Sequence, residues 1–142
     1  MTSNQGRRTS IPKDDTTSAS SVMDLKNLIV ESLDGDKGDD IQVINLEGQS
    51  ALADYIIVVS GTSSRHIVSM AEKLRERLHA HGTQDIRIEG IGQANWVVLD
   101  AGDVIVHLFR PEVREFYNIE KMWSVPGVTI NAAPKSSGLK AV

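Results

Sequence analysis

Apolar residues along the chain change several times between the period of a helix and the alternation of a strand. Residues 22–33 place four aliphatic side chains on one helical face, namely Leu25, Leu28, Ile29 and Leu33. Residues 55–60, YIIVVS, are apolar at nearly every position, which predicts a central strand covered on both faces. The rest of the chain predicts a strand at 41–46, a helix at 63–81, a strand at 86–90, a hairpin at 95–109 and a helix that starts at Pro111.

This order of elements predicts an α/β fold, in which a single domain holds a mixed five-stranded sheet flanked by helices. The length of 142 residues suits one domain with a sizeable core. Residues 1–20 are polar, residues 124–142 mix Pro, Gly, Ser and small side chains, and neither segment shows a hydrophobic period. We therefore expect a disordered polar tail at 1–20, a folded domain at 21–123 and a flexible C-terminal tail at 124–142.

Composition excludes several classes of protein. The chain has no cysteine, so neither a disulfide framework nor thiolate chemistry is available. No stretch approaches the roughly 18 to 20 apolar residues of a membrane span. The N-terminus also lacks the apolar core of a secretory signal. These features predict a cytoplasmic protein of a bacterium, with no membrane partner.

Charge is spread unevenly along the chain. Residues 22–123 hold 10 Lys and Arg against 17 Asp and Glu, a net charge of −7, whereas the two ends together are basic. Phosphate contacts need Lys and Arg, so an acidic folded body predicts at most a minor direct contact with RNA. The acidic body suits a basic protein partner, or it serves only to keep the domain soluble.

The predicted hairpin carries the most informative surface. A two-residue turn at 101–102 places Asp100 opposite Asp103 and Trp96 opposite His107. Side chains alternate between the two faces of a strand, so one face of this hairpin is entirely aliphatic and predicts core. The other face mixes aromatic, apolar and acidic side chains: Trp96, Val98, Asp100, Asp103, Ile105, His107 and Phe109.

Three interpretations of this mixed face are open. A helix packs on it and makes Trp96 an ordinary core residue, or the face binds a partner, since tryptophan is enriched among interface anchors. Two directly opposed aspartates repel each other, which favours a cationic partner above them. Alternatively, a homodimer buries Trp96 and Phe109 across a twofold axis. His107 is predicted to be a strand-face histidine rather than a metal ligand.

The segment SGTSSRH at 60–66 joins the buried strand to the next helix and admits two interpretations. One of the hydroxyl side chains at 62–64 caps the helix, or the helix N-terminus binds an anion with help from Arg65. His66 and its neighbouring serines point in different directions at a helix start, so they do not form a nucleophile and its base. The chain has no nucleophile elbow, P-loop or dinucleotide motif. The histidines share no ligand spacing with carboxylates, so we expect neither a metal nor a cofactor.

Three segments form a recognisable set in order and spacing. They read GTSSRH at 61–66, WVVLDAGDVIVH at 96–107 and EVREFYNIEKMW at 112–123. The set resembles the ribosomal silencing factor family, whose members are also called Iojap-like proteins, and the resemblance covers about residues 22–123. The signature turn of this family corresponds to Gly61, Thr62, Ser63, Ser64, Arg65 and His66.

The resemblance implies both a fold and a function. The implied fold is similar to that of nucleotidyltransferases, with a mixed sheet and flanking helices. The implied function is binding of the large ribosomal subunit through ribosomal protein L-fourteen, which blocks joining of the small subunit and represses translation. Organelle members of the family also assist assembly of the large subunit.

The resemblance further implies which residues meet the partner. Trp96 and Tyr117 carry the contact role, and Asp100 and Asp103 act as charge partners. Arg114 either joins the contact or pins the last helix. The further candidate contacts are His107, Phe109 and Arg114.

A nucleotidyltransferase-like enzyme that uses residues 60–66 is the alternative function. Such enzymes hold metal ions with a pair of carboxylates near their Gly-Ser turn. Here Glu72 and Glu76 lie on the predicted helix, while Asp100 and Asp103 flank a turn. Because the sequence shows no metal-holding pair, we expect a non-enzymatic protein.

Overall fold

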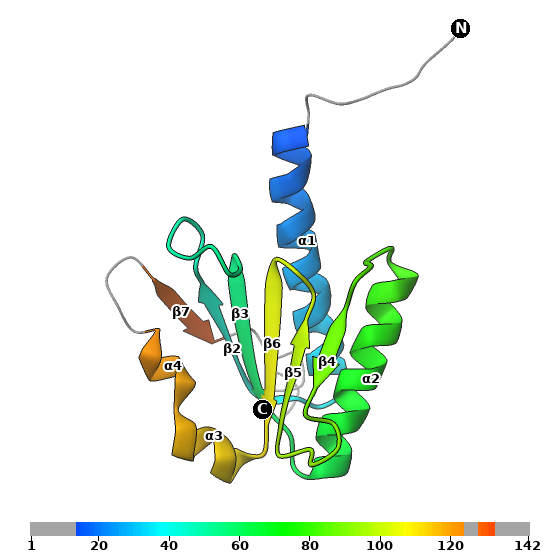
Figure 1. The fold of residues 1–142 in the computed structure, drawn as a ribbon, viewed down its shortest axis with the longest axis vertical. Helices are drawn as coiled ribbons and strands as arrows, with labels where there is room; N and C mark the ends of the chain where they lie inside the picture. The colour runs from blue at the N-terminus through cyan, green and yellow to red at the C-terminus, as the bar shows by residue number, and fades with distance from the viewer. Residues whose placement is uncertain (1–13, 124–127, 133–142) are drawn as a thin grey trace, which may run out of the picture.

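The computed structural model describes residues 14–123 and 128–132, which form a six-stranded mixed sheet with helices on both faces (Figure 1). The strands lie in the order β4-β5-β6-β3-β2-β7. Strands β3 and β6 are parallel, and every other neighbouring pair is antiparallel. In chain order the elements are α1 (Asp14–Gly35), β2 (Asp39–Asn45), β3 (Tyr55–Ser60), α2 (Ser64–Ala80), β4 (Arg87–Glu89), β5 (Trp96–Asp100), β6 (Val104–Phe109), α3 (Pro111–Tyr117), α4 (Ile119–Met122) and β7 (Thr129–Ala132).

The sheet separates two hydrophobic cores, and the central strand β3 contributes to both. Ile57 and Val59 face the larger core, which α1 and α2 cover. Ile56 and Val58 face a smaller core with Phe109 of β6 and residues of α3 and α4. All six residues of β3 are buried, which confirms the predicted central strand. Within the described residues, no helix is both long and apolar enough to cross a membrane.

The sixth strand corrects the prediction of five. Strand β7 lies in the segment 124–142, which the sequence predicts to be flexible, and it pairs antiparallel with β2. Ile130 of β7 packs against the smaller core. The local sequence did not reveal this strand because a four-residue edge strand depends on its neighbour for pairing and burial. The segments 124–127 and 133–142 lie outside the described residues.

Helix α1 begins at Asp14, although the sequence predicts disorder up to residue 20 and a helix from residue 22. Its packed part carries the apolar stripe, and Ile29 and Leu33 are fully buried. Once that part is nucleated, adding turns costs only helix propagation, so polar residues extend the helix without a hydrophobic period. Figure 1 shows the first turns of α1 extending beyond the sheet and the other helices. The predicted disorder of residues 1–13 lies outside the described residues.

The register of the β5–β6 hairpin also differs from the prediction. Asp100 pairs with Ile105 rather than Asp103, and Trp96 pairs with Phe109 rather than His107. The turn is centred on Gly102, which has a φ of 92°, a conformation that glycine adopts at low cost. The shift amounts to two residues, so each side chain keeps its predicted face. The two aspartates are therefore not directly opposed, because Asp103 lies in the turn.

The last helical segment is split at Asn118. Its φ of 47° is left-handed, a conformation that Asn tolerates better than most residues. The predicted helix from Pro111 therefore becomes α3 followed by the short α4, and the change of direction lets Ile119 reach the smaller core.

Candidate functional site

Five aromatic rings form a continuous series from solvent to core, which we call the aromatic face. Ring centroids are 5.0 Å apart for Phe116 and Tyr117, and 4.8 Å apart for Tyr117 and Trp96. Trp96 also lies 4.8 Å from Phe109 and 5.8 Å from His107. Exposure falls from 79% at Phe116 to 51% at Tyr117 and 0% at Phe109. Such ring pairs stabilise beyond the area they bury, so each ring in the series favours the position of the next.

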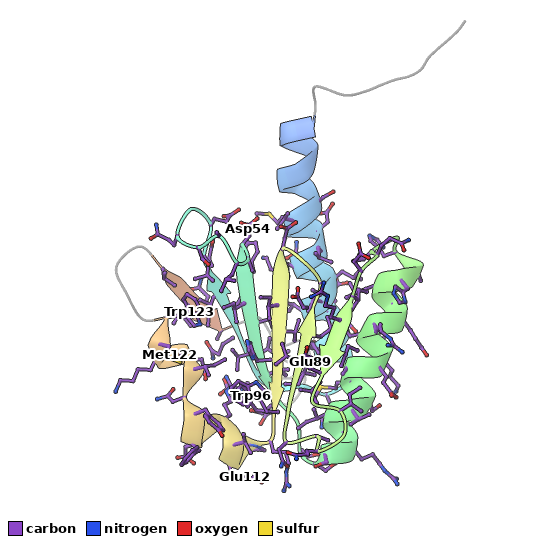
Figure 2. All side chains as sticks on the ribbon, in the orientation of Figure 1. Asp54, Glu89, Trp96, Glu112, Met122 and Trp123 are labelled. Carbon is purple, nitrogen blue, oxygen red and sulfur yellow. The ribbon has the colours of Figure 1, made fainter. Side chains whose placement is uncertain are left out.

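The sheet face behind these rings is only partly covered. Helices α3 and α4 cover the face of β3 and β2, where Ile44, Ile56 and Val58 are buried. On β5 and β6 the same face stays half-buried at Val98 and Ile105. The predicted covering helix is therefore correct for β2 and β3, and the predicted accessible face is correct for β5 and β6. Trp96 lies at the border between the two parts, beside α3 (Figure 2).

His107 anchors Trp96 within this face. The indole Nε1–H of Trp96 donates to Nδ1 of His107 at 2.9 Å. An indole can only donate, so Nδ1 is the unprotonated acceptor and the ring is neutral. Burial lowers the pKa of His107 to about 4, because desolvation penalises the imidazolium. His107 therefore orients Trp96 and does not itself offer a charge to a partner.

This lowered pKa predicts that acid weakens the fold. The unfolded chain takes up a proton at His107 near pH 6.5, but the folded chain does so only near pH 4, so stability falls as the pH drops through this window. Between pH 7.5 and 5.0 we expect a loss of about 2 kcal/mol from this group. Urea unfolding of the wild type and of His107→Gln measures it, because the variant lacks the titrating group.

The matched control for this measurement is His79→Gln, which removes an exposed histidine of α2. It should keep the wild-type dependence on pH. A His107→Gln protein that loses as much stability as the wild type between the two pH values would contradict the assignment.

The two predicted charge partners lie at the far end of the face from Trp96. A carboxylate oxygen of Asp100 accepts from the Gly102 backbone N–H at 2.8 Å, and Asp103 is exposed in the turn. The Asp103 carbonyl accepts from the N–H of Asp54, which Figure 2 shows at the opposite end of the sheet from Trp96. Trp96 and Asp100 are four positions apart along β5, or about 13 Å. The aromatic and acidic groups therefore share one face but form separate patches.

Several polar groups of the SGTSSRH turn form hydrogen bonds within the protein. The Ser63 hydroxyl accepts from the His66 backbone N–H at 3.1 Å, so Ser63 is the helix cap among the three predicted candidates. The Thr62 N–H donates to His66 Nδ1 at 3.0 Å, which leaves Nε2 to donate to the Asp36 carbonyl at 2.9 Å. A β-carbon at Gly61 would lie 2.8 Å from the Ile67 side chain, so only glycine fits there. The turn thus connects β3, α2 and the α1–β2 loop.

The turn and the hairpin aspartates lie at opposite ends of the sheet. Because β3 and β6 are parallel and in register, Ser60 neighbours Phe109, and Tyr55 neighbours Val104 at the other end. The two ends are five positions apart along β6, about 17 Å. Asp100 and Asp103 therefore cannot hold a metal ion at the turn. Across residues 14–123 and 128–132, no three His, Asp or Glu side chains are grouped so that they could hold a metal ion.

Arg114 occupies the end of the sheet near the turn and is only 6% exposed. Its guanidinium donates to the Ser60 hydroxyl at 2.8 Å and makes a two-pronged ion pair with Glu120, at 3.2 and 2.8 Å. Asp40 lies 3.5 Å from the same group. Arg114 thus connects α3, α4 and β3, which supports the helix-pinning role over a direct partner contact.

Sequence reasoning missed two parts of this arrangement. Phe116 is the most exposed ring, and its only sequence signal is its place beside Tyr117 in a helix that buries other positions. The partnership of Arg114 with Ser60 and Glu120 joins residues up to 54 positions apart, so no local pattern reports it. Of the predicted contact residues, Trp96 and Tyr117 pack against each other. Asp100 and Asp103 lie at the far end of the sheet face, and Arg114 lies near the turn at 60–66.

The fold is that of a small α/β domain, and the aromatic face is its candidate binding surface. Comparison with known sequences gives the family. Residues 19–140 match the family described as "Ribosomal silencing factor during starvation". The chain belongs to the ribosomal silencing factor family. Members of this family act in ribosome silencing and the regulation of translation.

Relatives from bacteria and organelles agree with this assignment. Ribosomal silencing factor RsfS of Zymomonas mobilis is 50% identical over 114 residues, which are 80% of this chain and 85% of that protein. RsfS of Haemophilus influenzae is 38% identical over 72% of this chain and all of that protein. The mouse protein "Mitochondrial assembly of ribosomal large subunit protein 1" is 32% identical over 70% of this chain and 45% of its own length.

Solved structures support the fold. A crystal structure of a Chromobacterium violaceum protein superposes with a TM-score of 0.69 at 33% identity, over 80% of this chain and 97% of that one. A Bacillus halodurans structure gives 0.65 at 34% identity, over 71% and 94%.

Proposed function

We propose that this protein binds the large ribosomal subunit through ribosomal protein L-fourteen and thereby blocks joining of the small subunit. Family membership supports this proposal, and the exposed end of the aromatic face carries it for this chain. Tyr117 is exposed and packs on the half-buried Trp96, and both residue types are enriched among interface anchors. The named role of the mouse relative in assembly of a ribosomal large subunit favours a further role in biogenesis.

The mechanism is steric and requires no turnover. A protein that occupies a subunit-joining surface excludes the other subunit for as long as it stays bound. A specific interface of usual size buries about 800 Å² on each partner. The net charge of −7 over residues 22–123 favours approach to a basic ribosomal protein and disfavours direct binding of RNA.

Subunit reassociation tests this function directly. Purified large subunits are incubated with the protein, small subunits are then added, and the mixture is separated on a sucrose gradient. We expect the whole-ribosome peak to fall and the free subunits to remain. Leu52→Ala, which alters an exposed apolar residue of the β2–β3 loop, is the control and should act as the wild type does. A full whole-ribosome peak at saturating wild-type protein contradicts the proposal.

We further infer that the nucleotidyltransferase-like fold is kept here without its chemistry. The turn at 60–66 uses Ser63 and His66 for internal bonds, and the hairpin aspartates lie at the other end of the sheet. This arrangement supports binding as the function, in a cytoplasmic protein with no catalytic residue.

A further inference from the structure

A pocket of about 370 Å³ lies beside Trp96. It is near the lower end of the roughly 300 to 1,000 Å³ of ligand sites, so it suits one large side chain better than a nucleotide. We call it the anchor pocket, and it is lined by Gly90, Gln93, Asn95, Trp96, Val113 and Tyr117.

The two walls of the anchor pocket are connected. One wall is the β4–β5 loop, which Ala94 closes by donating its N–H to the Gly90 carbonyl at 2.8 Å. A β-carbon at Gly90 would collide with the Trp96 carbonyl, so the loop lies tightly against the start of β5. The other wall is α3, and the Arg110 N–H donates across to the Asn95 carbonyl at 3.1 Å. A pocket with such tied walls is formed before a partner arrives, which lowers the entropic cost of binding.

The lining of the pocket combines apolar and carboxamide side chains. Trp96, Val113 and Tyr117 supply apolar and aromatic walls. Gln93 and Asn95 are exposed, and each carboxamide can both donate to and accept from a peptide backbone. This combination fits an apolar side chain on a peptide segment.

Charged residues on the neighbouring sheet face indicate which other residues the partner's peptide segment carries. Cross-strand pairing puts Glu89 beside Val98 and Arg87 beside Asp100, on the same face as Trp96. Asp100 and its neighbour Arg87 lie at the far end of this face, whereas Glu89 lies two strand positions from Trp96 and precedes Gly90 of the pocket, within a domain of net negative charge. A basic residue a few positions from the apolar side chain would match Glu89.

We propose that the anchor pocket receives one large apolar side chain of the basic ribosomal protein, from a segment that also presents a Lys or Arg to Glu89. This inference rests on the proposed function and specifies the partner's chemistry at that surface. The pocket extends the contact beyond Trp96 and Tyr117 to the β4–β5 loop.

Filling the pocket tests this proposal. Gln93→Phe puts a ring at its edge, and Asn95→Phe does so from a second position. Gln49→Phe makes the same change at an exposed glutamine of the β2–β3 loop. Binding is measured by co-sedimentation with isolated large subunits, and thermal unfolding verifies that each variant folds. We expect both pocket variants to bind at least tenfold more weakly than the wild type, and Gln49→Phe to bind as the wild type does.

The outcomes separate the pocket from the proposed function. If the wild type does not bind the large subunit, the proposed function fails, and this inference with it. If the wild type binds, Tyr117→Ala weakens binding and both pocket variants bind normally, only the pocket inference is overturned. Light scattering adds a further outcome: the pocket variants lose self-association but keep subunit binding. The pocket inference is then overturned too, because the occupant is a second copy of this chain.

Discussion

Tyr117→Ala is expected to weaken binding of the large ribosomal subunit by roughly thirtyfold while the protein stays folded. Interface anchors of this type cost about 2 kcal/mol or more on truncation, which corresponds to that change in affinity. Tyr117 is 51% exposed, so its removal takes little packing away from the folded domain. Co-sedimentation with isolated large subunits at several protein concentrations measures the affinity.

Two further variants sharpen this prediction. Trp96→Ala should lose binding to at least the same degree, because it removes the ring that Tyr117 packs against and the bond to His107. Tyr117→Phe keeps the ring and should retain most of the affinity. Wild-type affinity in both alanine variants would show that another face meets the ribosome.

Arg114→Met is expected to lower the free energy of unfolding by roughly 3 to 5 kcal/mol, the usual cost of removing one partner of a buried ion pair. The change leaves Glu120 facing a buried apolar group and removes the donor to the Ser60 hydroxyl. Total stability of a domain is commonly about 5 to 15 kcal/mol, so this one side chain decides a large share of it. Urea unfolding monitored by tryptophan fluorescence gives the difference.

Arg110→Met is the matched control for Arg114→Met. Arg110 pairs with Glu112 at 2.9 Å, and their side chains are 38% and 60% exposed, so the loss of this pair should cost about 1 kcal/mol or less. In the double variant Arg114→Met/Glu120→Leu the carboxylate that faced Arg114 is removed as well, and we expect part of the lost stability to return. Equal costs for Arg110→Met and Arg114→Met would contradict the structural role of Arg114.

The candidate site was only partly predictable from the sequence. Alternation along β5 and β6 correctly placed Trp96 and His107 on one face, and the two-residue error in register did not change that face. The same error did change the predicted cross-strand neighbours. It put Asp100 opposite Asp103, whereas Asp100 pairs with Ile105 and Asp103 lies in the turn. Pairing across strands depends on turn geometry around Gly102, which the sequence only suggests.

The sequence by itself determined the order of the elements from α1 to β6, the central position of β3 and the family. These follow from local periodicity and motif spacing, which act over a few residues. Tertiary structure alone decided which part of the second sheet face α3 and α4 cover, that β7 completes the sheet, and that Arg114 is held by Ser60 and Glu120. Those features depend on contacts between residues far apart in the chain, whose burial and pairing exist only once the sheet has formed.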